Sequence, residues 1–184
     1  DKGVLIEHHG LVNTTINSAI TFSVSFNSSF YQSTAFGFDS ATWVIWMTLT
    51  SGAELVLASS MDFQSELASI VSVTHLMMTP SMLSVLTIDK LHSIETVISG
   101  GEYCEPQLAE KWLHRVNFFN AYGPTEVSIC TTIHKVIDSK NVSLGKGIAN
   151  TYLFILTDNL ALAPLGALGE LYIGGDGLAR GYLN

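Results

Sequence analysis

Apolar runs and helix-start signals alternate along the middle of the chain. The apolar runs have the length of buried strands; they cover residues 54–58, 73–78, 94–98 and 116–119. Between them, three segments open on a residue that favours a helix N-terminus. These segments begin at Asp62, Pro80 and Pro106, and we expect them to be helical to about residues 71, 86 and 115. This alternation predicts right-handed βαβ units and a mostly parallel sheet.

The pattern changes after about residue 150. Residues 152–157 and 170–173 are short apolar segments flanked by Gly and Pro, which predicts short strands joined by turns. We therefore predict an α/β fold in two parts. Residues 1–150 form an α/β core, and residues 151–184 form a smaller β-rich segment.

The predicted topology indicates where a ligand binds. In open parallel sheets, ligands bind beyond the carboxyl ends of the strands. Three of the predicted strands lead into residues 77–79, 99–102 and 120–126. The second of these segments is rich in glycine and the third is polar with a Gly-Pro pair, so both allow a ligand to approach backbone N–H groups closely.

The composition is unusually apolar for a complete soluble domain. Charged residues make up 13% and hydrophobic residues 47% of the chain, whereas about 25% charged residues is usual. A membrane helix does not explain this composition, because polar residues interrupt even the most apolar stretch, residues 43–61. No signal-peptide pattern is present. We therefore expect the buried middle of a larger protein, and the cysteine usage described next leads us to expect a cytoplasmic one.

Charge and cysteine usage exclude several classes of function. The net charge of −8 and eight scattered Lys and Arg residues argue against nucleic-acid binding. Cys104 and Cys130 lie far apart and outside any CxxC motif, which argues against a disulfide framework or a cysteine zinc site. His8 and His9 are adjacent and point in different directions, so they cannot easily share a metal.

Residues 120–126 carry the most specific chemistry in the chain. Tyr122 offers a flat face for a base, and Gly123-Pro124 favours a turn. Thr125 offers a hydroxyl and an N–H to a phosphate oxygen, and Glu126 offers a hard carboxylate to Mg²⁺. On composition alone, a simple turn between two strands explains the segment equally well.

Four segments together resemble motifs of one enzyme family. Asn120-Ala121-Tyr122-Gly123-Pro124-Thr125-Glu126 resembles the AMP-binding motif of the adenylate-forming superfamily, in the form typical of adenylation domains of nonribosomal peptide synthetases. Residues 169–183 resemble the next motif of these domains. Lys2-Gly3-Val4 resembles the end of their phosphate loop, and Phe38-Asp39-Ser40 resembles the motif that opens their amino-acid pocket. All four occur in the order of the family, so the resemblance covers the whole chain.

The resemblance implies a nucleotide site made of a few named residues. Thr125 would contact the α-phosphate of ATP or AMP, Glu126 would hold Mg²⁺, and Lys2 is what remains of the cationic phosphate loop. The adenine side would be formed by Gly101, Glu102, Asn120, Ala121, Tyr122 and Gly123. Within the glycine-rich end of the chain, Gly174, Gly175 and Gly177 are interpreted as turn and packing positions, and Arg180 as a structural contact.

The resemblance also implies an amino-acid pocket. Asp39 would pair with the α-ammonium of the substrate, because a desolvated ammonium needs a charged partner. The alternative for Asp39 is an N-cap of a helix over residues 40–49, and both roles are compatible. The pocket positions of the family fall on Asp39, Ser40, Trp43, Met77, Ile98, Gly100, Ala121, Ile129 and Cys130. This set is similar to that of phenylalanine-activating domains, except at Ser40, Met77 and Gly100.

The implied reaction joins an amino acid to AMP and then passes it to a carrier-protein phosphopantetheine. The implied partners are the peptidyl carrier and condensation domains of the same synthetase. The small C-terminal subdomain of the family, with its catalytic lysine, is absent from these residues, so we expect the chain alone to be inactive. Three alternatives remain: an acyl- or aryl-CoA ligase of the same superfamily, a non-catalytic adenylation-like scaffold, and a dinucleotide-binding oxidoreductase.

Overall fold

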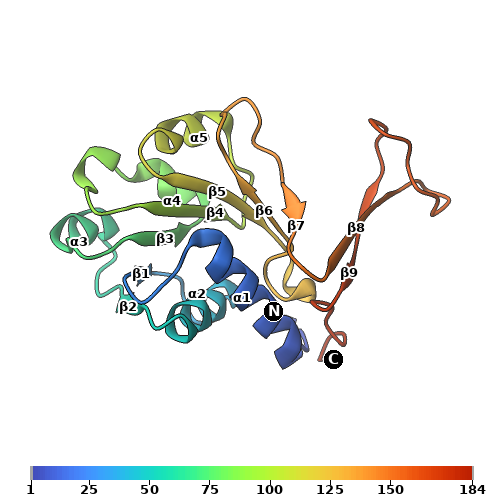
Figure 1. The fold of residues 1–184 in the computed structure, drawn as a ribbon, viewed down its shortest axis with the longest axis horizontal. Coiled ribbons are helices and arrows are strands. Elements are labelled where there is room, and N and C mark those ends of the chain that lie inside the picture. The colour runs from blue at the N-terminus through green and yellow to red at the C-terminus, as the bar shows by residue number, and fades with distance from the viewer. Residues whose placement is uncertain (1, 184) are drawn as a thin grey trace.

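A computed structural model describes residues 2–183 and contains one large sheet (Figure 1). Its strand order is β2-β1-β3-β4-β5-β6-β7. The parallel strands are β1 (Ser29–Gln32), β2 (Glu54–Leu57), β3 (His75–Met78), β4 (Thr96–Gly100) and β5 (Asn117–Tyr122). The antiparallel strands are β6 (Thr132–Lys135) and β7 (Lys146–Gly147). The predicted α/β fold with a mostly parallel sheet is confirmed.

Helices cover both faces of this sheet. One face carries α1 (His8–Phe22) and α2 (Asp39–Thr50), and the other carries α3 (Phe63–Ser69), α4 (Pro80–Val85) and α5 (Pro106–Leu113). Because strand side chains alternate between faces, two separate cores form. Phe22, Trp43 and Met47 pack with Met77, Ile98 and Phe119 on the first face. Leu67, Leu83 and Trp112 pack with Leu76, Val97 and Phe118 on the second. The short 3₁₀ helices are η1 (Ile88–Lys90) and η2 (Thr125–Val127).

The predicted helix starts in the middle of the chain are confirmed. Asp62 caps α3 by accepting a hydrogen bond from the Ser65 N–H at 3.1 Å. Thr79 caps α4, and Pro80 and Pro106 occupy the first turns of α4 and α5, where a missing N–H costs no hydrogen bond.

The N-cap alternative for Asp39 is wrong. Phe38 is the N-cap of α2 and makes no side-chain capping bond, so Asp39 is the first residue inside the helix. The Asp39 carboxylate instead accepts a hydrogen bond from the Thr125 hydroxyl. Two strand boundaries also differ from the prediction. Strand β4 runs two residues later, to Gly100, and β5 extends to Tyr122, so part of each predicted ligand loop lies within a strand.

A separate two-stranded antiparallel sheet follows the large one. It consists of β8 (Thr151–Leu156) and β9 (Glu170–Gly175), and it projects from the α/β core in Figure 1. After β9 the chain returns to its own N-terminal segment. Val4 pairs with Tyr182, and the Leu5 N–H donates to the Gly181 carbonyl at 2.9 Å. The two ends of the described chain are thus joined.

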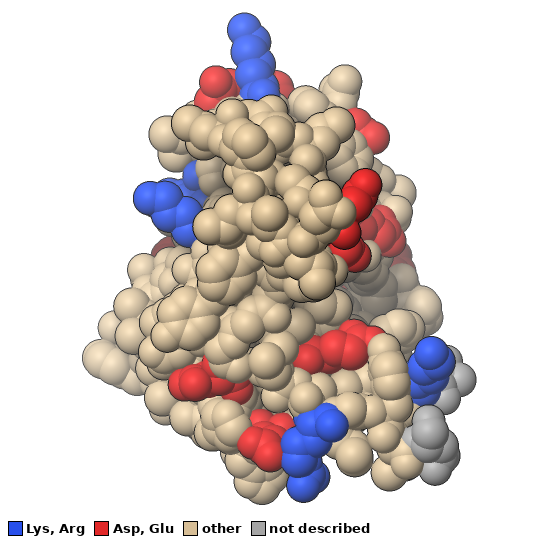
Figure 2. All heavy atoms as spheres, turned by 90° about the vertical axis from the view of Figure 1, so that its right-hand side faces the viewer, with Lys and Arg blue, Asp and Glu red and all other residues tan. Residues whose placement is uncertain are grey.

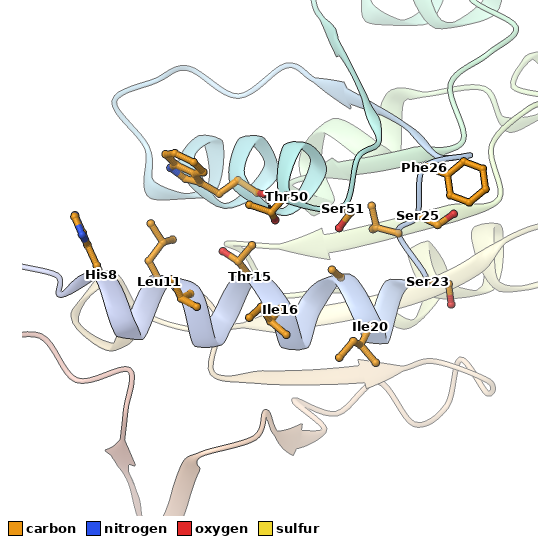
Figure 3. Close-up of a pocket in the computed structure, with 14 residues that line it drawn as sticks. His8, Leu11, Thr15, Ile16, Ile20, Ser23, Ser25, Phe26, Thr50 and Ser51 are labelled. Carbon is orange, nitrogen blue, oxygen red and sulfur yellow. Dashed lines mark hydrogen bonds between the residues drawn. The ribbon is translucent and has the colours of Figure 1, made fainter.

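The surface carries few charges and several large apolar side chains. Figure 2 shows Lys and Arg standing apart on the face nearest the small sheet, without a basic patch. An apolar groove of about 960 Å³ runs between α1 and the end of α2, lined by Leu11, Ile16, Ile20 and Trp46 among others (Figure 3). Ile20 is 74% exposed there, and such a face favours association of the isolated chain. Among the described residues, no helix is both long and apolar enough to cross a bilayer.

His75 makes the stability of the fold dependent on pH. The residue is 3% exposed, its Nε2 lies 3.1 Å from the Phe22 carbonyl oxygen, and its ring stacks on Phe30. Burial lowers the pKa of His75 below its usual 6.5, so the unfolded chain binds more protons than the folded chain as the pH falls through about 6.5. We therefore predict that Tm drops by roughly a few degrees between pH 7.5 and 5.5. In scanning calorimetry, His75→Gln should flatten this slope, whereas His114→Gln, at an exposed position, should retain it. An unchanged slope in His75→Gln would contradict the prediction.

Candidate active site at the carboxyl edge of the sheet

A cavity of about 660 Å³ lies at the carboxyl ends of β3, β4 and β5. The parallel register of these strands brings together residues that are more than 20 positions apart in sequence, such as Gly100 and Ala121. Most of the predicted site residues line this cavity: Asp39, Ser40, Trp43, Met77, Gly100, Gly101, Glu102, Ala121, Tyr122, Gly123, Ile129 and Cys130. The cavity therefore lies where the sheet topology predicts a ligand site.

Two predicted residues, Ile98 and Asn120, line neither this cavity nor the second cavity described below. Ile98 is completely buried beneath the first cavity, two residues before Gly100 on the same face of β4. Asn120 points to the opposite face of β5 from Ala121, because side chains alternate along a strand. Its amide donates a hydrogen bond to the Ser143 carbonyl at 2.9 Å, so the side chain is bound to the loop that contains Ser143.

The inner wall of this cavity is apolar. Trp43, Ala121 and Cys130 are almost completely buried, and the Trp43 ring packs against Phe22 at a centroid distance of 5.9 Å. Burial raises the pKa of the Cys130 thiol to about 12, so the thiol stays protonated and is not a nucleophile at neutral pH. Met78, in the segment 77–79 that the topology indicated, also lines the cavity. Sequence reasoning missed two further flexible methionines of the lining, Met61 and Met82, which belong to no motif.

A second cavity, of about 590 Å³, adjoins the first. It is lined by Lys2, Thr125 and Glu126, the residues predicted to meet the phosphates and the metal. Asp39 lines both cavities and accepts a hydrogen bond from the Thr125 hydroxyl at 2.5 Å. The half-buried Asp39 carboxylate forms no ion pair with any residue that the structure describes. A carboxylate in this setting favours a cationic ligand.

Glu126 is held by a residue that the sequence did not single out. The Tyr182 hydroxyl donates to Glu126 Oε1 at 2.5 Å, and the Lys2 Nζ lies 4.9 Å from the centre of the Tyr182 ring. The hydrogen bond from Tyr182 lowers the pKa of Glu126, so the carboxylate is ionised at neutral pH. An ionised carboxylate offers about four lone-pair sites, and one carboxylate beside bound phosphates is the usual protein contribution to Mg²⁺. The donor set therefore fits Mg²⁺, although no cluster of three metal-ligating side chains occurs in residues 2–183.

The Glu102 carboxylate joins the neighbouring strand end to α4. Its Oε2 accepts hydrogen bonds from both the backbone N–H and the hydroxyl of Ser81, at 3.0 and 2.5 Å. These bonds lower the pKa of Glu102. They fix the carboxyl group beside Gly101, whose φ of +85° is one that glycine adopts without strain.

The loop after Glu126 has a strained backbone. Ser128 and Ile129 have φ values of 55° and 77°, in the left-handed region. This region is especially unfavourable for Ile129, because its side chain is β-branched. Ser128 is held by α1 and by the end of the chain: its carbonyl accepts from the Thr14 hydroxyl at 2.9 Å, and its hydroxyl donates to the Gly177 carbonyl at 2.7 Å. These contacts fix Ile129 at the boundary of the two cavities.

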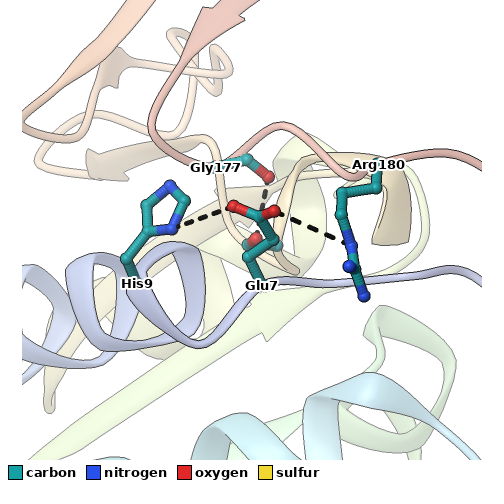
Figure 4. A network of polar contacts seen from close by, with 5 residues as sticks. Glu7, His9, Gly177 and Arg180 are labelled. Carbon is teal, nitrogen blue, oxygen red and sulfur yellow. Dashed lines mark hydrogen bonds and ion pairs between the residues drawn. The ribbon is translucent and has the colours of Figure 1, made fainter.

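The segment around Gly177 is itself tied to the N-terminal part of the chain (Figure 4). The Glu7 carboxylate lies 3.1 Å from His9 Nδ1 and 3.7 Å from Arg180 Nε. Arg180 is thus a structural contact in this structure. Gly177 packs tightly, since a Cβ there would lie 2.8 Å from the Val127 carbonyl oxygen. No helix follows β9 within residues 2–183, which is unlike a dinucleotide-binding loop.

Comparison with known proteins identifies the family. The model of the AMP-binding enzyme family matches residues 1–183. The chain therefore belongs to the AMP-binding enzyme family. The resemblance to adenylation domains of nonribosomal peptide synthetases, which the motifs predict, is confirmed by relatives and by solved structures.

The relatives are much longer than this chain. Tyrocidine synthase 1 of Brevibacillus parabrevis is 35% identical over 192 residues, which cover 100% of this chain and 18% of that protein. Bacitracin synthase 3 of Bacillus licheniformis is 35% identical over 188 residues, which cover 100% of this chain and 3% of that protein. The chain thus spans less than a fifth of either relative.

Two solved structures show the same fold. Holo-AB3403, a four-domain nonribosomal peptide synthetase bound to AMP and glycine, matches with a TM-score of 0.88 at 30% identity, covering 98% of this chain and 14% of that one. The N-terminal subdomain of Klebsiella oxytoca NpsA, in complex with 3-hydroxybenzoyl-AMSN, matches with a TM-score of 0.86 at 25% identity. That match covers 100% of this chain and 50% of the NpsA chain.

Gly123 is required by the close approach of the strained loop. A Cβ at Gly123 would lie 2.3 Å from the Ile129 carbonyl oxygen and 2.7 Å from the Thr131 nitrogen, and neither backbone atom can move alone. We predict that Gly123→Ala lowers the free energy of unfolding by about 1–3 kcal/mol, as overpacking does elsewhere. Gly174→Ala is the matched control, because a Cβ there meets nothing within 4 Å. Urea denaturation of both variants measures the difference, and equal midpoints would refute the prediction.

Proposed function

We propose that this chain forms the substrate-binding part of an enzyme that activates an amino acid with ATP. The observation that carries the proposal is the position of Asp39. Its carboxylate lies at the junction of an apolar cavity and a cavity lined by Lys2, Thr125 and Glu126. An amino acid bound across this junction would have its side chain in the apolar cavity, its ammonium on Asp39 and its carboxylate towards the phosphate side.

In the proposed reaction, the amino-acid carboxylate attacks the α-phosphorus of ATP, which forms an aminoacyl adenylate and releases pyrophosphate. No protein nucleophile is needed, so the residues act by positioning and by charge stabilisation. Thr125 contacts the α-phosphate, Glu126 holds Mg²⁺, and Lys2 contributes positive charge. Mg²⁺ would neutralise charge on the phosphates. Tyr122, with Gly101 and Glu102 opposite, would contact the adenine.

The proposed substrate is a large hydrophobic amino acid similar to phenylalanine. Trp43 offers an aromatic wall, Gly100 and Ala121 leave volume, and Ile129 and Cys130 are apolar. Within the cavity, the charged side chains are Asp39 and Glu102, and Glu102 is engaged by Ser81. A charged substrate side chain would therefore be unpaired in the apolar part.

Activation of an aryl acid is the second candidate, because the similar NpsA structure contains a 3-hydroxybenzoyl group, which has no ammonium. Asp39 favours the first candidate, since an acid without an ammonium leaves the carboxylate unpaired.

We further propose that the aminoacyl group passes to the phosphopantetheine of a carrier domain, within a synthetase that also has condensation domains. An artificially fused adenylation–PCP di-domain of Klebsiella oxytoca NpsA and ThdA has a similar structure, with a TM-score of 0.85 at 25% identity.

The first test is amino-acid-dependent ATP–pyrophosphate exchange by the whole adenylation domain that contains this chain. We expect exchange with phenylalanine or a similar residue, and a loss of at least about 100-fold in Asp39→Ala, because that change leaves the ammonium unpaired. The matched control is Asp158→Ala, which removes an exposed carboxylate of the β8–β9 loop. Exchange only with acids that lack an amino group would assign the protein to the aryl- or acyl-activating branch. A folded domain with no exchange at all would favour a scaffold.

Residues 1–184 alone should form little or no adenylate. Lys2 is the one Lys or Arg side chain that lines the phosphate-side cavity within residues 2–183, and the reaction brings two anions together there. The measurement is adenylate formation by the purified chain beside the whole domain at equal concentration. Comparable rates would show that this chain is sufficient.

A further inference from the structure

The hydrogen bond between Thr125 and Asp39 joins the two halves of the proposed active site. The residues are 86 positions apart, and the Thr125 hydroxyl donates to Asp39 Oδ2 at 2.5 Å in a partly buried setting. Asp39 borders the amino-acid cavity, whereas Thr125 lines only the phosphate-side cavity. This bond is therefore a direct link between the group proposed to bind the ammonium and the group proposed to bind the phosphate.

The hydroxyl cannot serve both partners at once. A threonine hydroxyl has one hydrogen to donate, and both a carboxylate and a phosphate oxygen are acceptors. While the hydrogen points to Asp39, a phosphate beside Thr125 receives no hydrogen bond from this hydroxyl. Conversely, a hydroxyl that turns to a phosphate leaves Asp39 with one donor fewer in a partly desolvated site, which is unfavourable for a carboxylate.

An amino-acid ammonium resolves this competition. It brings three N–H donors and a positive charge, so it can satisfy Asp39 fully. We propose that the ammonium replaces the Thr125 hydroxyl on Asp39 and that the released hydroxyl then donates to the α-phosphate of ATP. Amino-acid binding thereby raises the affinity for ATP, and by linkage ATP raises the affinity for the amino acid by the same factor. This inference rests on the proposed function.

The surroundings of Thr125 allow this exchange without movement of the loop. Thr125 begins η2, whose turn is closed by hydrogen bonds from Val127 N–H to the Pro124 carbonyl and from Ser128 N–H to the Thr125 carbonyl. The Ala179 N–H also donates to the Glu126 carbonyl at 2.9 Å. Asp39 is held in the first turn of α2. Because these bonds involve backbone groups only, they leave the Thr125 side chain free to change its χ1 rotamer and turn the hydroxyl away from Asp39.

The experiment measures binding in the whole adenylation domain with a nucleotide that cannot react. Isothermal titration calorimetry gives the Kd of α,β-methylene-ATP with Mg²⁺, alone and in saturating phenylalanine. The readout is the ratio of the two Kd values, because Thr125→Val also removes a proposed phosphate contact and weakens binding in both titrations. We expect a ratio of about five or more in the wild type, within the usual range of coupling between sites. The ratio should fall to about one in Thr125→Val and be retained in Thr125→Ser, which keeps the hydroxyl.

A ligand control tests the same step in the unmodified protein. 3-Phenylpropionate has the side chain and carboxylate of phenylalanine but no ammonium, so it should leave the nucleotide Kd nearly unchanged. A wild-type ratio of about one, an equal ratio in Thr125→Val, or an equal effect of 3-phenylpropionate would each overturn the inference. Amino-acid-dependent exchange by the wild type would persist in those cases. Its absence with every amino acid would instead overturn the proposed function, and the inference with it.

Discussion

The parallel hydrogen bonding of β3, β4 and β5 fixes the geometry on which the site depends. Their register aligns Met77 with Ile98 and Ile98 with Phe119, so all three strands end at one edge. Two residues further along, Gly100 stands opposite Ala121, and a Cβ at Gly100 would lie 3.2 Å from the Ala121 carbonyl oxygen. A slip of one residue in either pair would turn the cavity-facing side chains to the opposite face. The sheet therefore fixes one wall of the cavity, and the helices and loops complete the rest.

Helix α1, which contacts the loop at Ser128, packs in an unusual way. Helix α1 buries Thr14, Thr15 and Ser18 and exposes Ile16 and Ile20, the reverse of a surface helix in a self-contained domain. Small polar residues on the buried face let the loop at Ser128 come close enough to bond to Thr14. Gly10 serves the same contact, since a Cβ there would lie 2.5 Å from the Ser128 hydroxyl oxygen. The helix thus supports the active-site loop by close polar contacts as well as by apolar packing.

The elements that could be predicted from the sequence are those that carry a local signal. Helices α3, α4 and α5 were predictable because Asp62, Pro80 and Pro106 act locally, on the backbone of the next turn. Helix α1 was not predicted, because its apolar positions do not mark its buried face and its Thr, Asn and β-branched residues have low helix propensity. Strand β1 was missed because it is inserted between β2 and β3, a pairing that no local pattern encodes. Twelve of the predicted site residues line the first cavity, whereas the Asn120 side chain lies on the other face of β5 from Ala121 because the strand continues through it. Tyr182 was missed because its contact with Glu126 joins residues 56 positions apart.

The strained backbone at Ser128 and Ile129 is held by contacts with distant parts of the chain. A left-handed β-branched residue costs on the order of 1–3 kcal/mol and persists only where its surroundings hold it. Here the support comes from three directions: Thr14 on α1, the Gly177 carbonyl after β9, and the close contact with Gly123. Ile129 borders both cavities, and Gly177 lies near the contact between Glu7 and Arg180. Segments near the beginning and the end of the chain therefore together support the loop that separates the two cavities. The segment that follows β9, although it contributes no residue to the apolar cavity, thus supports the loop that borders it.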